Sequence, residues 1–321
     1  MTSLKCAVVG VGHLGRFHAQ KYQAAKNAEL VAVCDPSSDR LKAMSEELKV
    51  PGVSNYKDLL GKVDAVTVAA ITPAHYEISK FFLENSVHVN VEKPLTTTSQ
   101  EGEELCKIAE SKNLVLQVGH VERFNPALIS AQKKLKEPLF IECHRLAPFK
   151  PRSMDVSVVL DLMIHDLDVI LSLVKSEPIA VSAIGSPVLT SLPDIANARI
   201  EFASGCVANV TSSRVSQRSE RKFRVFQPSQ YLSIDFGSGE VNLLTKTGEL
   251  TGDLMSGEVD LPLEADAWSL EKGDALLAET QSFVDSIVES RPPVVSGRDG
   301  LIALRLAEKI LEDINQRLKN K

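Results

Sequence analysis

The sequence predicts an α/β protein with an N-terminal doubly wound parallel sheet and a C-terminal α+β domain built on a large, mostly antiparallel open sheet. Three observations carry this prediction. Over the first 120 residues, short apolar runs alternate with segments of helical periodicity. Between about residues 180 and 250, apolar and polar residues alternate instead. The chain has 321 residues, which is enough for two domains at roughly 150 residues each.

The N-terminal domain is assigned to residues 1–120. Apolar runs typical of strands buried on both faces are Leu4–Val9, Leu30–Cys34, Ala65–Ala70, Val87–Val91 and Leu114–Val118. Helical patterns separate them at Gly15–Lys26, Asp39–Lys49, Ala74–Asn85 and Ser99–Lys112. Parallel strands need crossover connections of this length, and right-handed crossovers place helices on both faces of the sheet.

The second domain is assigned to residues 121–321. It begins with a helix at Asn125–Lys136, a strand at Phe140–Arg145 and a long helix at Val156–Val174. Two hairpins are expected to turn at Ser204-Gly205 and at Gly237-Ser238-Gly239, and consecutive hairpins give antiparallel pairing. Terminal helices are expected at Asp274–Ser290 and Gly300–Lys319, the last packing back on the first domain.

Composition narrows the class of partner. The 36 Lys and Arg against 42 Asp and Glu give a net charge of −6, so no basic surplus attracts nucleic acid or anionic lipid. The five cysteines form no CxxC pair, which argues against a disulfide framework or a zinc site. The most apolar stretch, Val156–Val174, contains four ionisable residues and cannot cheaply span a bilayer. We predict a cytoplasmic protein without a signal peptide that binds a small molecule, with no nucleic-acid, membrane or metal partner.

Gly10, Gly12 and Gly15 form a GxGxxG motif that directly follows the first strand and opens the first helix. In that position the glycines allow a tight turn, a close approach of the backbone to a pyrophosphate, and close packing of helix on strand. The intervening His13 and Leu14 belong to the same turn. Glycines also end strands for structural reasons alone, but the context here predicts a dinucleotide-binding Rossmann domain.

Asp35 lies 20 residues after Gly15, at the end of the second strand. A carboxylate there accepts hydrogen bonds from the adenosine ribose hydroxyls and repels the 2′-phosphate of NADP. The sequence therefore favours NAD, although Arg40, Ser37 and Ser38 leave NADP open.

Lys93 follows the fourth strand in the segment Val91-Glu92-Lys93-Pro94. Ligands bind outside the carboxyl ends of strands in such sheets, so Lys93 is expected near the nicotinamide end of the cofactor. A lysine in a dehydrated cleft can exchange a proton with a hydroxyl or carbonyl. The alternative, a solvated lysine paired with Glu92, is equally compatible with this segment alone.

Asp161 and His165 stand four residues apart in an otherwise apolar helix, which places them on one face, one turn apart. There the carboxylate can orient the imidazole or share a substrate hydroxyl with it. A buried histidine satisfied by a neighbouring aspartate is the structural alternative. Two ionisable groups in the most apolar helix are costly unless they line a cleft, which favours catalysis.

Together, three motifs resemble the glucose-fructose oxidoreductase, inositol dehydrogenase and rhizopine-catabolism (Gfo/Idh/MocA) family. They are GVGHLGRFHA with His18, EKP at Glu92–Pro94, and DxxxHxxD at Asp161, His165 and Asp168. The resemblance spans the whole chain. It implies hydride transfer between a sugar or polyol carbon and nicotinamide, with Lys93, Asp161 and His165 around that carbon. It also implies a substrate domain whose outer sheet face joins subunits, giving a homodimer or homotetramer.

Other residues are assigned through this resemblance. Ile71, His75 and Glu92 are placed in the cofactor site, and Arg123 in the substrate site because it follows the fifth strand. The alternative for Arg123 is an ion pair with Glu122. Val156-Ser157 and Met163 stand where the family often has glycine. Their larger side chains are expected to narrow the space over the nicotinamide or the sugar.

Within the family, the stretches GHLGRFHAQKY and GHVERFNP look most similar to a branch that oxidises the 3-hydroxyl of a nucleotide sugar such as UDP-N-acetylglucosamine. Five basic residues lie close together in the sequence: Arg214, Arg218, Arg221, Lys222 and Arg224. They could form a clamp for a diphosphate or the solvated rim of a hairpin, and the rim is slightly favoured. We predict an NAD(P)-dependent dehydrogenase of a sugar. The alternatives are an NAD-dependent glycosidase without net redox change and a catalytically silent nucleotide sensor.

Overall fold

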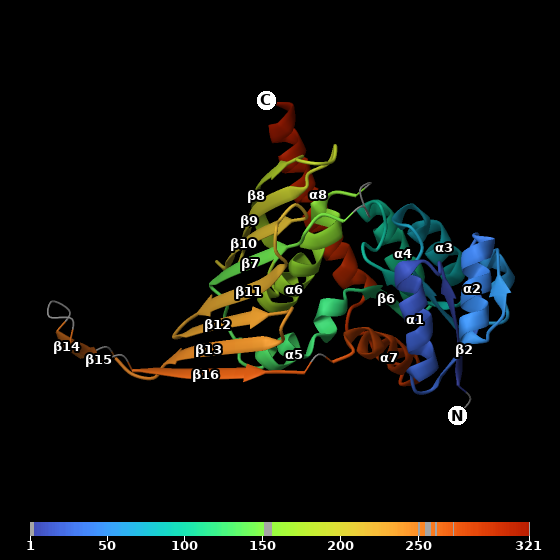
Figure 1. The fold of residues 1–321 in the computed structure, drawn as a ribbon, viewed down its shortest axis with the longest axis horizontal. Helices are drawn as coiled ribbons and strands as arrows, with labels where there is room; N and C mark the ends of the chain where they lie inside the picture. The colour runs from blue at the N-terminus through green and yellow to red at the C-terminus, as the bar shows by residue number, and fades with distance from the viewer. Residues whose placement is uncertain are drawn as a thin grey trace. The chain divides into compact units, whose positions relative to one another are not determined.

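The computed structural model describes residues 3–150, 156–249, 251–253, 258–260, 262–271 and 273–320. The chain divides into two compact units (Figure 1). One holds the described residues up to Phe124 together with Asp274–Arg305, and the other holds Asn125–Gly273 together with the chain from Leu306 onward. The division is therefore not a single cut at residue 120, because a late segment of the chain belongs with the first unit.

The first unit is built on a six-stranded parallel sheet with strand order β3-β2-β1-β4-β5-β6. This is the doubly wound order, in which the chain reverses direction across the sheet between β1 and β4. The strands are β1 (Leu4–Val9), β2 (Ala28–Cys34), β3 (Gly52–Val53), β4 (Ala65–Val68), β5 (His88–Glu92) and β6 (Leu116–Gly119). The predicted Rossmann sheet is confirmed.

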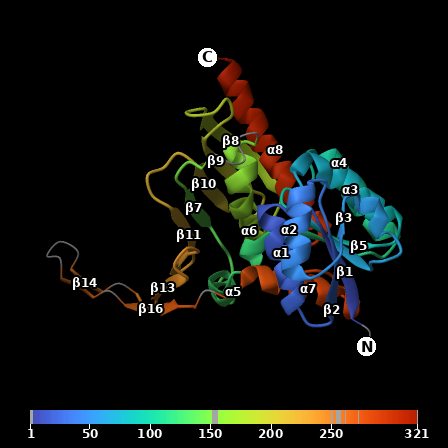
Figure 2. The same cartoon turned by 45° about the vertical axis from the view of Figure 1, so that its right-hand side comes forward.

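Helices cover both faces of this sheet (Figure 2). They are α1 (His13–Ala24), α2 (Ser38–Leu48), α3 (Thr72–Glu84), α4 (Ser99–Ser111) and α7 (Ala275–Val288), with short 3-10 turns η1 (Tyr56–Leu59) and η2 (Val121–Phe124). Alternate residues of β1 enter two separate cores. Cys6 and Val8 join a core with α1, α2 and α7, whereas Ala7 and Val9 join a core with α3 and α4. Burial on both faces explains why these strands read as continuous apolar runs.

The second unit is built on an eight-stranded sheet with order β16-β13-β12-β11-β7-β10-β9-β8. Its pairs are antiparallel except β7 with β10, as predicted for a mostly antiparallel sheet. The strands are β7 (Phe140–Leu146), β8 (Pro178–Ser186), β9 (Ile195–Phe202), β10 (Val207–Ser213), β11 (Glu220–Gln227), β12 (Gln230–Asp235), β13 (Glu240–Lys246) and β16 (Leu263–Ser269).

Helices cover one face of this sheet. They are α5 (Pro126–Gln132), a π-helical turn η3 (Val159–Met163), α6 (Ile164–Val174) and the C-terminal part of α8 (Gly297–Lys319). Their apolar residues form one core with the inward-facing positions of the strands. Along β9, buried side chains on the helix-covered face alternate with exposed side chains on the other face, which is the pattern of a sheet open on one side.

The structure differs from the sequence expectations at several elements. The segment expected as one helix over Val156–Val174 consists of the π-helical turn followed by α6. Strands β3 and β16 were not expected, nor was the separate two-stranded pair of β14 (Thr251–Asp253) and β15 (Glu258–Asp260). The five cysteines are all buried free thiols. Within the described ranges, no helix is both long and apolar enough to span a membrane.

Candidate functional site

The turn after β1 is shaped by its glycines. Gly10 has a φ of +87°, and a Cβ atom there would lie 2.6 Å from the backbone nitrogen of Ala70. A Cβ atom on Gly15 would lie 1.7 Å from the carbonyl oxygen of Gly10, whereas one on Gly12 would meet nothing within 4 Å. Gly10 and Gly15 are therefore required for packing, and Gly12 leaves open space beside the backbone. This arrangement fits a pyrophosphate group, which needs a close approach to the main chain.

The first turn of α1 can receive an anion. Its N-cap, Gly12, makes no side-chain capping bond, and the first turn contains no acidic residue. The leading N–H groups of a helix lack intrahelical partners, so they can donate to phosphate oxygens. The predicted cofactor residues His13, Leu14 and Ile71 are exposed at the ends of β1 and β4, with Ile71 73% exposed. Their contact with NAD stays a prediction.

Asp35 is fixed at the end of β2 by hydrogen bonds to both carboxylate oxygens. Oδ2 accepts from the backbone N–H of Val11 at 2.9 Å, and Oδ1 accepts from that of Ser37 at 2.9 Å. Arg40 donates from Nε and Nη2 to Oδ1 at 3.1 and 3.0 Å. Asp35 is thus tied to the glycine turn, as a ribose-binding carboxylate must be. The guanidinium of Arg40 lies beside it. The carboxylate of Asp35 would repel a 2′-phosphate, whereas the guanidinium would attract it.

Glu92 and His18 form a buried pair behind the predicted catalytic lysine. Nε2 of His18 lies 2.7 Å from Oε1 of Glu92, and the other carboxylate oxygen accepts from the backbone N–H of Lys93 at 3.2 Å. Burial alone would lower the pKa of His18, but the hydrogen bond and charge of Glu92 outweigh it and raise that pKa. In turn, His18 holds the pKa of Glu92 below its ordinary value despite burial. The pair therefore fixes the main chain of Lys93.

A second buried carboxylate, Glu279 of α7, lies beside this pair. The side-chain amide of Asn90 donates to its Oε1 at 3.5 Å, and Gln117 donates to its backbone carbonyl at 3.1 Å. Burial, reinforced by the charge of Glu92, raises the pKa of Glu279 to about 8. Sequence reasoning missed this residue. The available signal was its place four residues before Phe283, on the buried face of an apolar helix.

His75 and Arg123 have defined local contacts in the first unit. His75 is buried, with Nδ1 2.9 Å from the carbonyl oxygen of Pro94 and Nε2 3.1 Å from that of Ala70. Burial lowers the pKa of His75, although its two carbonyl partners favour the protonated ring, and the ring joins the chain segments that follow β4 and β5. Arg123 donates to the carbonyl oxygen of Val294 at 3.2 Å. Their roles toward cofactor and substrate stay predictions.

Asp161 and His165 lie in the second unit, in η3 and α6, and both are partly buried. The neighbouring Asp166 is neutralised by Arg145 of β7, which donates two hydrogen bonds of 2.8 Å to its two oxygens. A buried ion pair with both hydrogen bonds in place holds α6 on the sheet. Lys93 belongs to the first unit, so the predicted catalytic residues come from both units.

Met163 does not narrow the space over a nicotinamide or a sugar, as was expected from the sequence. Its side chain is fully buried in the apolar core of the second unit, where it packs with α6 and the sheet. It therefore fills the core rather than the space over a nicotinamide or a sugar. Ser157 is also buried, and its hydroxyl accepts from the backbone N–H of Leu160 at 3.5 Å, so it begins the helical segment.

The five basic residues at 214–224 do not form one cluster. Arg214 is buried against Asp194 at 2.8 Å, Lys222 contacts Asp235 at 3.0 Å, and Arg224 contacts Glu142 at 2.8 Å. Successive residues of a strand point to opposite faces of the sheet, so Arg221 lies on the helix-covered face with Phe223, opposite Lys222 and Arg224. The arrangement separates Arg221 from its charged neighbours in the sequence.

Comparisons with known proteins agree with this geometry. Residues 4–120 match the model of an oxidoreductase family with an NAD-binding Rossmann fold, and residues 131–228 match the Gfo/Idh/MocA C-terminal domain. The fold and the glycine turn thus define an NAD-binding oxidoreductase. The chain belongs to the Gfo/Idh/MocA family, which confirms the family, the enzyme class and the cofactor NAD that the sequence predicted.

Individual relatives are similar over almost the whole chain. A UDP-N-acetylglucosamine 3-dehydrogenase from Acidithiobacillus ferrooxidans is 36% identical, with 97% of each chain covered. A solved structure of that enzyme superposes with a TM-score of 0.90 at 34% identity, covering 98% of this chain and 99% of the other. A Myo-inositol 2-dehydrogenase from Thermotoga maritima is 29% identical, with 97% of each chain covered.

The first prediction concerns the choice between NAD and NADP. The Asp35→Ser variant removes the carboxylate that repels a 2′-phosphate and releases Arg40 to bind it. We expect the ratio of the dissociation constants for NADP and NAD to fall by about tenfold or more, equivalent to about 1.4 kcal/mol. Fluorescence titration of both nucleotides measures this ratio. The double variant with Arg40→Met should lose the gain, and an unchanged ratio in Asp35→Ser would contradict the role of the carboxylate.

The second prediction concerns the pH dependence of stability. Folding raises the pKa of Glu279 from 4.5 to about 8, so the folded protein holds a proton that the unfolded chain releases. The stabilisation is complete below the unfolded pKa and falls as pH rises toward about 8, by at most about 1.4 kcal/mol per pH unit. Glu279→Gln, which cannot ionise, should gain stability relative to the wild type across that range.

Urea unfolding at several pH values between those limits tests this expectation. Glu240→Gln, which changes an exposed carboxylate, is the matched control and should follow the wild-type curve. If Glu279→Gln also keeps the wild-type pH dependence, Glu279 does not carry the buried proton.

Proposed function

We propose that this chain is an NAD-dependent dehydrogenase of a nucleotide sugar that oxidises the 3-hydroxyl of UDP-N-acetylglucosamine to a ketone. The observation that carries the proposal is the 36% identity to a UDP-N-acetylglucosamine 3-dehydrogenase over 97% of both chains. The chain also carries Lys93, Asp161 and His165, which the family resemblance places around the reacting carbon.

The cofactor supplies a nicotinamide carbon that accepts a hydride from the sugar. The chain must therefore remove the proton from the hydroxyl oxygen that is bonded to the same carbon. His165 is suited to this step because its Nδ1 is buried while the side chain is partly exposed, and we assign the accepting role to Nε2. Asp161 orients the substrate and the imidazole. The Lys93 ammonium stabilises the developing ketone oxygen, and Glu92 and His18 hold the lysine in place.

The third prediction tests these roles. Lys93→Ala and His165→Ala should each lower kcat by about 10²- to 10⁴-fold, the usual contribution of a positioned acid or base. NAD binding should persist, because neither residue belongs to the glycine turn. Lys175→Ala, at the end of α6, is the matched control with an expected wild-type rate. Near-normal turnover in either catalytic variant would refute the assignment.

The substrate is identified by following NADH formation with UDP-N-acetylglucosamine, other nucleotide sugars, free sugars and inositols. The proposal requires NADH to accumulate with the nucleotide sugar. Glycoside cleavage without NADH would identify an NAD-dependent glycosidase. NAD binding without any turnover would identify a nucleotide sensor.

We propose further that the protein is a homodimer or homotetramer that associates through the open face of the eight-stranded sheet. Large apolar side chains are exposed there on separate strands: Ile184, Ile195, Phe226 and Leu263. The support for the proposal is that this face has no helical cover and carries these exposed apolar side chains, which association through a symmetric interface would remove from water.

The fourth prediction tests this surface. Sedimentation equilibrium should give a multiple of 35.0 kDa, and Phe226→Asp should shift the mass toward the monomer because a carboxylate is costly in an apolar interface. Ile71→Asp, on the first unit, is the control for an equally polar change at an exposed apolar residue. A monomeric wild type would exclude the proposal.

A further inference from the structure

We propose that Arg145 and Arg214 are positioning residues that act on the reaction through the segment carrying Asp161 and His165. Each arginine holds one end of the helical segment that contains the π-helical turn η3, and each does so through a buried ion pair. The inference rests on the proposed function, because it takes Asp161 and His165 to act in proton transfer.

The two arginines lie at the same end of the eight-stranded sheet. Arg145 is near the end of β7 and Arg214 directly follows β10, and this pair of strands is parallel, so their carboxyl ends meet. Arg145 is opposite Ser212 in the register of the pair, and Arg214 follows two residues later. Because η3 packs on β10 and α6 packs on β7, the parallel pairing places one arginine beside each part of the helical segment.

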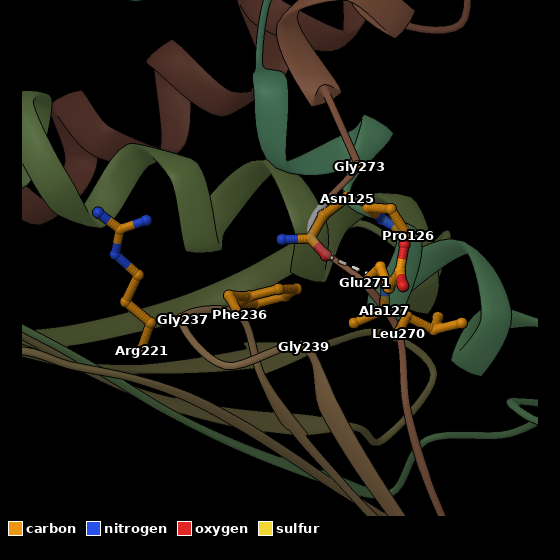
Figure 3. Close-up of a pocket in the computed structure, with 10 residues that line it drawn as sticks. All are labelled: Asn125, Pro126, Ala127, Arg221, Phe236, Gly237, Gly239, Leu270, Glu271 and Gly273. Carbon is orange, nitrogen blue, oxygen red and sulfur yellow. Dashed lines mark hydrogen bonds between the residues drawn. The ribbon is translucent and has the colours of Figure 1, made fainter.

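A third arginine at this end of the sheet has a different place. Arg221 of β11 is opposite Arg145 in the register of β11 and β7. It lines a cavity of about 230 Å³ together with Asn125 and Phe236 (Figure 3). Arg145 and Arg214 are instead paired with aspartates inside the core, so the inference concerns these two.

Arg214 fixes the chain that leads into η3. Its guanidinium donates from Nη1 to the backbone carbonyl of Val156 at 2.7 Å and from Nε to the carboxylate of Asp194 at 2.8 Å. The backbone N–H of Val158 donates to the carbonyl of Pro193, the residue before Asp194, at 3.0 Å. The π-helical turn therefore begins from a short segment whose first and last residues are both anchored.

Asp194 is itself held by the loop that precedes it. Its Oδ2 accepts from the backbone N–H groups of Val188, Leu189 and Thr190 at 2.8, 2.6 and 2.8 Å, and its Oδ1 accepts from the hydroxyl of Thr190 at 2.8 Å. Burial alone would raise the pKa of Asp194, but these backbone donors and Arg214 lower it, which favours the ionised carboxylate. The carboxylate is thus a fixed anchor for the guanidinium.

The anchored segment sets the position of Asp161 directly. The backbone N–H of Asp161 donates to the carbonyl of Ser157 at 3.0 Å, and Ser157 lies between the two anchored residues. On the other side of η3, Arg145 donates two hydrogen bonds of 2.8 Å to Asp166, the residue after His165. A π-helical turn is a rare conformation that persists where surrounding contacts determine it. The two ion pairs supply such contacts, one before Asp161 and one after His165.

Arg214→Lys and Arg145→Lys test these roles, because lysine keeps the charge beside each aspartate but lacks the paired donors of a guanidinium. With the sugar that NADH formation identifies, each variant should lower kcat by about ten- to a hundredfold, the loss expected from a displaced catalytic group. The solvent deuterium isotope effect on kcat should rise, because a slowed proton transfer limits the rate more strongly. The affinity for NAD should stay at the wild-type value, since the glycine turn belongs to the first unit.

The matched control is Arg317→Lys on α8. Arg317 also bonds an aspartate and a hydroxyl, those of Asp313 and Ser182, and we expect wild-type kcat and a wild-type isotope effect. A merely structural role of Arg214 or Arg145 would lower kcat only in proportion to the folded fraction seen in urea unfolding. It would leave the isotope effect unchanged, and that result would overturn the inference.

Hydrogen exchange of the backbone amides over residues 156–166 provides a test that needs no turnover. These amides should exchange faster in Arg214→Lys and Arg145→Lys than in the wild type and in Arg317→Lys, because the segment loses one of its anchors. Unchanged exchange in both variants would contradict the inference.

The outcomes separate this inference from the proposed function. If the wild type oxidises UDP-N-acetylglucosamine and both lysine variants keep its kcat, the positioning role fails although the function stands. If the wild type oxidises a different sugar and both variants are impaired with a raised isotope effect, the positioning role stands and the assigned substrate fails. If the wild type forms no NADH with any sugar, the proposed function fails and this inference fails with it.

Discussion

The contact between the start of α1 and the end of β1 is the constraint on which the site in the first unit depends. Gly15 packs so closely on Gly10 that a single methyl group would overlap the carbonyl oxygen. This contact sets the position of the N-terminal turn of α1 at the sheet edge. Asp35 then ties β2 to the same turn through Val11. The backbone groups that would hold a pyrophosphate are therefore fixed by packing, and the carboxylate that would hold a ribose is fixed by backbone hydrogen bonds.

A second constraint is the charge buried between β5, α1 and α7. Glu92 could not remain ionised in this core without His18, and the resulting pair fixes the backbone at Lys93. Burial, reinforced by the negative charge of Glu92, raises the pKa of Glu279 to about 8 and so favours its neutral form. The late helix α7 packs in the first unit through the buried side chains of Phe283 and Val284, and from there it supplies one side of the polar cluster.

The sequence predicted the parts of the fold that rest on local patterns. Strands buried on both faces gave uninterrupted apolar runs, and the GxGxxG motif with Asp35 located the cofactor turn. The prediction from sequence was wrong where tertiary packing decides which segments form strands and which side chains pair. The two-residue β3 carries no periodicity, and the largely exposed β16 has none of the apolar signal of a buried strand. The contact partners of Arg214, Lys222 and Arg224 depend on strand pairing, which sequence distance does not reveal.

The π-helical turn is the element of the candidate site that could least be predicted, and it matters for the catalytic pair. The backbone N–H of Ile164 reaches the carbonyl of Val159, five residues back. In a regular α-helix, residues four apart are offset by about 40° around the axis, at about 100° per residue. The two steps from Asp161 to Met163 lie in the π-helical turn and fall to about 82° each, whereas the two steps on to His165 lie in α6 and stay at about 100°, so the angular offset between the two positions falls to nearly zero. The turn thus brings the two backbone positions onto one line along the helix, while Met163 stays in the core. An ideal helix would have to rotate one of these residues away from its place.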